Sequence, residues 1–81
     1  MKIDKEEKFM FKYYIETLGK KVPITSKEYE DYMIEEAVDE GQTKTTAKRV
    51  IRENRQEARE EGKNIFILSF GAVLIIENEV K

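Results

Sequence analysis

The segment 43–62 constrains this chain most, because its charges fall into order when it is wound as an α-helix. It reads TKTTAKRVIRENRQEAREEG. At about 100° per residue, one side of the helix carries mostly apolar residues, namely Ala47, Val50, Ile51, Asn54 and Ala58. A stripe of cations runs beside that side and consists of Lys44, Lys48, Arg52, Arg55 and Arg59. Three acids lie opposite the stripe, namely Glu53, Glu57 and Glu60. The pattern predicts a long amphipathic helix with one basic edge.

The basic stripe weakens the helix that carries it. Lys44, Lys48 and Arg52 follow one another at steps of four residues, and Arg55 and Arg59 repeat the step. Like charges at this spacing cost a few tenths of a kcal/mol per pair. The stripe therefore indicates an anionic partner, most simply a phosphate backbone. The alternative explanation is chance, since 40% of the residues are charged and basic stems commonly cover the edges of a buried helix face.

Charge is unevenly divided along the chain. Residues 26–40 hold seven acids and one lysine, whereas residues 43–52 hold four bases and no acid. An acidic helix is thus followed directly by a basic one. The net charge of −2 argues against an indiscriminate, histone-like binder of nucleic acid, but it permits a local basic surface.

Composition narrows the classes of function. Eighty-one residues make a single small domain, 1–81. The chain has no cysteine and no histidine, which removes redox chemistry, the usual general base and the commonest metal ligand. It also has no GxGxxG, Walker or CxxC motif. We therefore expect no enzyme, no catalytic residue, no metal and no cofactor.

The sequence also suggests where the protein works. Its N-terminus lacks the apolar core of a signal peptide, and the apolar run 65–76 is too short for a bilayer, which needs roughly 20 residues. We expect a cytoplasmic protein with no membrane partner.

The remaining segments predict two further helices and a hairpin. A first helix is expected over residues 4–18, ended by Gly19 and apolar almost all round. Residues 22–25 are extended, and their proline would be tolerated in an edge strand. Ser26 is expected to cap a second helix, which Gly41 ends and which buries Tyr29, Tyr32, Met33, Ala37 and Val38. Gly62 ends the third helix, for which Thr43, Thr45 and Thr46 are all plausible caps.

A β-hairpin is expected at the C-terminus, turning at Gly71-Ala72. This turn would place Phe70 opposite Val73, Leu68 opposite Ile75 and Ile67 opposite Ile76. A buried helix is the alternative, but the β-branched residues disfavour it. The expected core consists of Phe11, Ile15, Leu18, Tyr32, Met33, Val50, Ile51, Leu68 and Ile75.

This order of elements, together with the stretch GQTKTTAKRVIREN, resembles the winged helix-turn-helix domains that bind duplex DNA. The resemblance implies an α+β fold, a three-helix winged helix-turn-helix-like domain with a C-terminal β-hairpin. It also implies that the third helix enters the major groove by its N-terminal half. Bases would then be approached by Gln42, Lys44, Thr45, Lys48 and Arg49, and phosphates by Arg52, Arg55 and Arg59. The apolar hairpin tip departs from the family, whose wings usually have a polar or basic tip.

The apolar tip suggests a contact between copies. Phe70 and Val73 are the expected dimer contacts, and a homodimer would suit a two-fold DNA site. A tip packed under the helices of a monomer is the competing arrangement. The favoured function is a small DNA-binding regulator of transcription or replication, of phage or plasmid type. The alternative is a small protein-interaction or inhibitor module that acts through the acidic second helix or the apolar hairpin.

Overall fold

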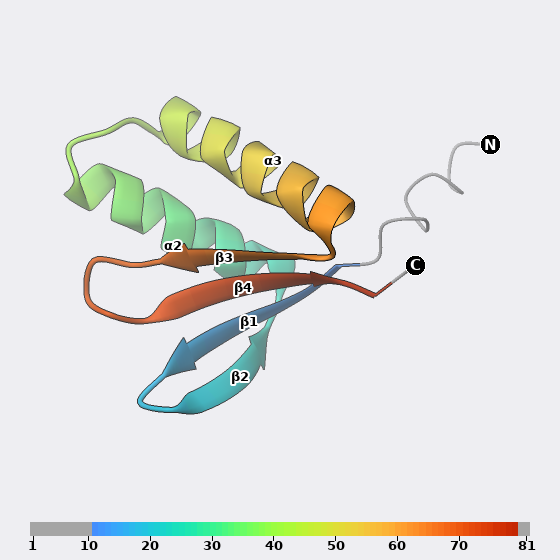
Figure 1. The fold of residues 1–81 in the computed structure, drawn as a ribbon. Helices are drawn as coiled ribbons and strands as arrows, with labels where there is room; N and C mark the ends of the chain where they lie inside the picture. The colour runs from blue at the N-terminus through green and yellow to red at the C-terminus, as the bar shows by residue number, and fades with distance from the viewer. Residues whose placement is uncertain (1–10, 80–81) are drawn as a thin grey trace.

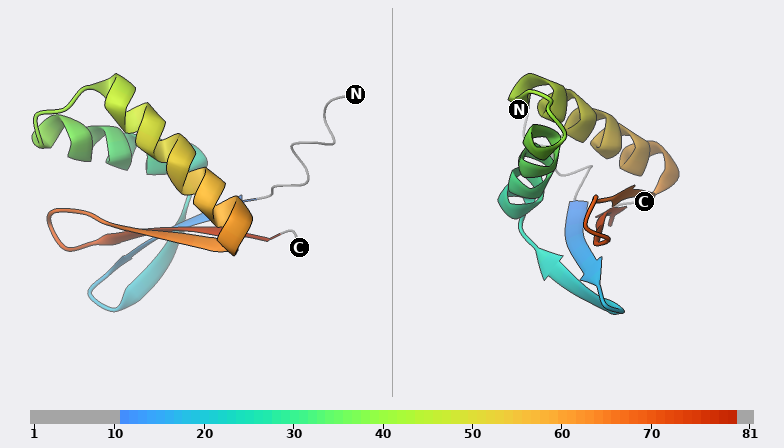
Figure 2. Two further views of the ribbon diagram at one scale, coloured as in Figure 1. Left: turned by 45° about the horizontal axis from the view of Figure 1, so that its top comes forward. Right: turned by 90° about the vertical axis from the view of Figure 1, so that its left-hand side faces the viewer.

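A computed structural model of the protein describes residues 11–79. It consists of a hairpin, two helices and a second hairpin (Figure 1): β1 (Phe11–Thr17), β2 (Lys20–Ile24), α2 (Ser26–Asp39), α3 (Lys44–Glu61), β3 (Lys63–Ile67) and β4 (Val73–Asn78). The four strands form one antiparallel sheet in the order β2-β1-β4-β3. Both helices cover the same face of this sheet (Figure 2). The protein is therefore a two-layer α/β sandwich.

The predicted three-helix winged helix-turn-helix fold is wrong. The described residues hold two helices and four strands, and the C-terminal hairpin joins β1 in one sheet. The helix expected over residues 4–18 is replaced from Phe11 onward by β1 and the turn that follows it, and residues 4–10 lie outside the described residues. β1 is a central strand, with Tyr13 buried on the helix-covered face and Tyr14 on the opposite face. Aromatic residues on both faces hide the alternation by which a strand is recognised.

The residues expected to end that helix form a tight turn. Thr17 pairs with Lys20, so only Leu18 and Gly19 connect β1 to β2. Both have positive φ, 52° and 80°, as a type I′ hairpin turn requires. Pro23 lies in β2 at the edge of the sheet, which confirms the predicted edge strand.

The second and third predicted helices are confirmed, with one change of cap. The expected burial of Val38 is wrong, because this residue near the end of α2 is 54% exposed. Thr25, not Ser26, caps α2: its hydroxyl accepts a hydrogen bond from the Glu28 amide at 3.0 Å, and the Glu28 carboxylate accepts from the Thr25 amide at 2.8 Å. Thr43 caps α3, and Gly62 ends it with a φ of 90°.

The C-terminal hairpin is confirmed, but its predicted register is wrong. Ile67 pairs with Val73 and Ile65 with Ile75, so residues 68–72 form a loop. Leu68 and Ala72 turn into the core and are linked by a hydrogen bond of 2.8 Å from the Leu68 amide to the Ala72 carbonyl. Because Leu68 and Ala72 fill the core and do not pair within the strand ladder, the loop is longer than the expected two-residue turn.

The core lies between the sheet and the helices. Tyr29, Leu74 and Ile76 are fully buried there, together with the predicted core residues Met33, Ile51 and Leu68. The predicted core residues Phe11, Ile15, Tyr32 and Val50 are partly buried and pack against it. Ile75 is buried, but the register turns it to the other face of the sheet. The expectation for Leu18 is wrong, because it is 98% exposed in the β1–β2 turn.

Candidate anion-binding groove

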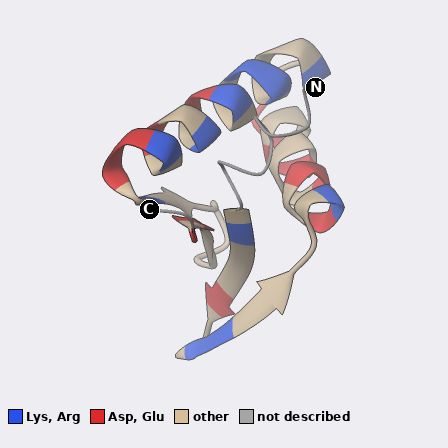
Figure 3. Ribbon diagram, turned by 90° about the vertical axis from the view of Figure 1, so that its right-hand side faces the viewer, with Lys and Arg blue, Asp and Glu red and all other residues tan. Residues whose placement is uncertain are grey.

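A groove of about 400 Å³ lies between α3 and the first half of α2. Its lining is Glu30, Lys48, Ile51, Arg52, Arg55 and Arg59. Four cations therefore share the groove with one acid. Figure 3 shows Lys and Arg recurring along α3 while Asp and Glu gather on α2. Four of the five cations of the predicted stripe therefore line this concave surface, and Lys44 lies outside its lining.

Arg55 is fixed at the base of this groove. Its Nη2 donates to Glu30 Oε2 at 2.8 Å, and its Nε donates to the Tyr13 hydroxyl at 2.9 Å. Burial lowers the pKa of Arg55, but the hydrogen bond to Glu30 and the Tyr13 hydroxyl outweigh burial and raise it above its usual value. Arg55 therefore holds α3 against α2 and β1 as a permanent charge.

Arg59 is also held by the fold. Its guanidinium carbon lies 5.8 Å from the centroid of the Phe11 ring, within the range of a cation–π contact. Its Nη1 donates to the Gln56 side chain at 2.6 Å. Phe11 thus positions Arg59 from β1.

Lys44, Lys48 and Arg52 differ from these two arginines. Their side chains are exposed and form no hydrogen bond or ion pair with any other residue in the range 11–79. They follow one another at one-turn steps, so the line rises about 12 Å along α3. Arg49, on another side of the helix, is paired with Glu53 at 2.9 Å. Free cations on this helix are thus confined to one line among the residues described.

The structure separates the other predicted site residues. Thr45 is exposed in the first turn of α3. Gln42 instead lines a second groove of about 540 Å³, together with Met33 and Phe66. The proposed dimer contacts are also apart. Phe70 lies beside Tyr32 of α2 and is 69% exposed, whereas Val73 lies on the face of the sheet opposite the helices.

Sequence reasoning missed the partners of the arginines, which are Glu30, Tyr13 and Phe11. Phe11 and Tyr13 are two residues apart, so they lie on one face of a strand but on different sides of a helix. Reading this segment as a strand would have placed both aromatic rings beneath the third helix. Glu30 carried no signal of its own among the many acids of the second helix.

Comparison with protein-family models, curated proteins and solved structures gives no significant match to this chain. Neither helix in residues 11–79 is long and apolar enough to cross a membrane. The same residues contain no group of three acids that could hold a metal ion.

Proposed function

We propose that this protein binds duplex DNA through phosphate contacts along one side of α3. The observation that carries the proposal is the line Lys44, Lys48 and Arg52, three cations without a partner among residues 11–79. Arg55 and Arg59 extend this positive surface along the groove, although both have partners within the fold. Cations that no carboxylate neutralises are available to displace the counterions of a nucleic acid, which supplies most of its non-specific affinity.

The proposal does not depend on winged-helix docking. Phosphate contacts need only an exposed basic line, and they act on all sequences alike. Base contacts stay a further prediction for the exposed residues in the first turns of α3, which are Lys44, Thr45, Lys48 and Arg49. A role in transcription or replication would follow from binding of this kind.

The test is a salt titration with labelled random-sequence duplex DNA, followed by fluorescence anisotropy. Three phosphate contacts predict a slope of about −2.7 in a plot of log affinity against log salt, since each contributes about −0.9. Arg52→Ala should reduce that slope by about one. Lys20→Ala is the matched control, because Lys20 is an exposed cation in the β1–β2 hairpin, outside the groove. It should leave the slope unchanged.

Two results would count against the proposal. One is the absence of binding at about 50 mM salt, where non-specific phosphate contacts are strongest. The other is an equal loss of slope for Lys20→Ala and Arg52→Ala, which would show that net charge acts and the line on α3 does not.

The acidic helix supports the alternative of a protein-interaction module less well. Several of its acids are used within the fold: Glu28 in the capping box, Glu30 on Arg55, Asp31 on Lys27, and Glu36 on the Ser69 amide and hydroxyl. A surface built for a basic partner would leave those carboxylates free. The apolar face of the sheet is a stronger candidate for a protein contact.

A further inference from the structure

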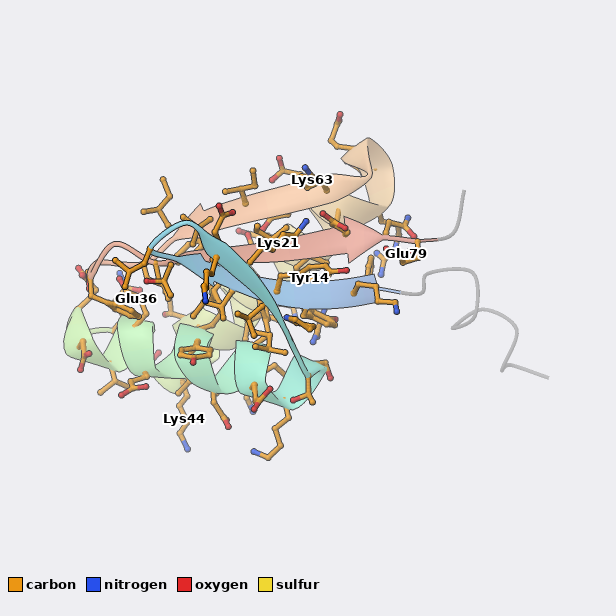
Figure 4. All side chains as sticks on the ribbon, turned by 90° about the horizontal axis from the view of Figure 1, so that it is seen from below. Tyr14, Lys21, Glu36, Lys44, Lys63 and Glu79 are labelled. Carbon is orange, nitrogen blue, oxygen red and sulfur yellow. The ribbon has the colours of Figure 1, made fainter. Side chains whose placement is uncertain are left out.

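The face of the sheet opposite α2 and α3 is here called the open face, and Figure 4 views the molecule from this side. The strand register gives this face an apolar band. The register places Pro23, Tyr14, Ile75 and Ile65 in one row across all four strands. Val73 and Ile67 continue the band over β4 and β3 in the next row, whose positions on β1 and β2 are Glu16 and Lys21. Ile65 and Ile67 are 56% and 69% exposed. No helix of residues 11–79 covers this band, which is the largest grouping of exposed aliphatic side chains on a strand.

We propose that a second copy of this chain packs on the open face, with the two-fold axis parallel to the strands. The two sheets would then stack face to face, with the helices of each copy on the outside. Stacking of this kind is the ordinary way to bury an apolar sheet face.

The charges next to the apolar band favour a second copy as the occupant. Lys12, Glu77 and Lys63 form a row across β1, β4 and β3, so the sign alternates from strand to strand. A two-fold axis parallel to the strands stacks each row on the same row of the partner copy. When the two copies align, β1 faces β4 of the partner copy, so Glu77 meets Lys12 and Tyr14 meets Ile75. A shift by one strand would instead place Glu77 on Glu77 or Lys12 on Lys12, so the charges select the aligned stack. The face is therefore self-complementary, as an isologous interface must be.

Lys21 fixes the position of a charged side chain on the open face. Its Nζ donates to Glu77 Oε2 at 2.8 Å and lies 4.5 Å from the centroid of the Tyr14 ring. The Lys21 stem thus crosses the apolar row and holds Glu77 in place. A carboxylate fixed in this way loses less side-chain entropy when it meets a lysine of another copy.

Pairing between the free edges of two β3 strands is a less favourable arrangement. Asn64 of β3 donates to Glu57 of α3 at 2.9 Å, so the acidic side of α3 lies over this edge. Glu53 and Glu61 follow on the same side, one turn before and after Glu57. Edge pairing would bring the acidic sides of two α3 helices together, and their repulsion opposes it.

The size of the open face limits the strength of the dimer. Four strands about 4.8 Å apart and about six residues long present roughly 400 Å² per copy. The total of about 800 Å² is below the area of a standard stable interface. The expected dimer is weak and reversible, and association should become visible only at tens to hundreds of micromolar protein.

The test is sedimentation of the wild-type chain between about 10 μM and 1 mM, compared with three variants. Ile65→Lys and Ile67→Lys should each weaken association at least tenfold. Phe70→Lys is the matched control, because Phe70 is as exposed as Ile67 but lies beside α2, away from the open face. It should associate as the wild type does. Circular dichroism checks the fold, and Ile67→Thr keeps a β-branched residue if Ile67→Lys does not fold.

Three results would overturn the proposal. A wild-type chain that stays at 9.6 kDa up to 1 mM excludes the dimer. An equal effect of Phe70→Lys would move the contact to the hairpin loop. New amide protection along β3 on association would indicate edge pairing. None of these measurements involves DNA, so failure of the dimer and failure of the proposed function are separable.

Discussion

The two halves of α3 carry similar residues and use them differently. In the C-terminal half, Asn54, Arg55 and Glu57 bind Tyr29 of α2, Tyr13 of β1 and Asn64 of β3 respectively. In the N-terminal half, Lys44, Lys48 and Arg52 have no partner among residues 11–79. The basic stripe is continuous in sequence, but the fold divides it. A cation with a carboxylate partner stabilises the structure, whereas one without a partner is available to a ligand.

The C-terminal half is anchored by buried polar contacts. Asn54 Nδ2 donates to the Tyr29 hydroxyl at 3.0 Å inside the core. Burial raises the pKa of Tyr29 to about 12, against a smaller lowering by the Asn54 hydrogen bond. Burying such groups is tolerable only while they stay bonded, so these contacts fix the position of α3 on the sheet.

Arg55→Ala should have the largest effect, a loss of about 2 kcal/mol in the free energy of unfolding. The substitution removes a charged hydrogen bond to Glu30 and leaves the half-buried Tyr13 hydroxyl without its donor. Urea denaturation at pH 7 measures the change. A loss under about 0.5 kcal/mol would contradict the division of α3, because it would make Arg55 energetically equivalent to an exposed lysine.

Tyr29→Phe should cost about 1 kcal/mol at pH 7, because Asn54 loses its buried acceptor. The cost should depend on pH. A raised pKa means that the folded state holds the phenolic proton more tightly, so the contribution is complete below about pH 10. It is lost as the pH rises through about 12.

The two chains should therefore converge in stability at high pH. Urea midpoints of wild type and Tyr29→Phe at pH 8 and pH 11 test this, since all other tyrosines and lysines are common to both. A difference between the chains that stays constant from pH 8 to pH 11 would show that Tyr29 does not carry the raised pKa.

Part of this fold could be predicted from local pattern. Helical periodicity, together with Thr43, Gly41 and Gly62, located α2 and α3, because caps and left-handed glycines act within a few residues. The role of β1 depended on contacts with β4, more than fifty residues away. Such pairing is invisible in a window of ten residues, and the run FKYYIET is apolar enough to suit either a helix or a buried strand.

The candidate site was predictable to a similar degree. The cations of α3 were found by their spacing, because helical spacing alone places them on one side. Which of them are free depended on Glu30 and Tyr13, whose positions follow from the sheet. The open face was missed because Ile75 was assigned to the core, and the register that turns it outward depends on the loop formed by residues 68–72.

Lys48→Ala should have the smallest effect on stability, and the effect should have the opposite sign. Lys48 lies four residues from both Lys44 and Arg52, so its removal relieves two repulsive pairs and introduces the best helix former. We expect the free energy of unfolding to rise by about 0.5 kcal/mol, while affinity for duplex DNA falls.

Arg49→Ala is the control from the same helix. It breaks the ion pair with Glu53, so it should not stabilise the helix by relief of repulsion. Urea denaturation and the salt titration on the same preparations measure both quantities. A Lys48→Ala chain that is clearly destabilised would assign Lys48 to the fold, and one that is stabilised with unchanged affinity would remove it from the binding surface. Opposite changes in stability and affinity are the signature expected of a residue retained for its ligand at a cost to the fold.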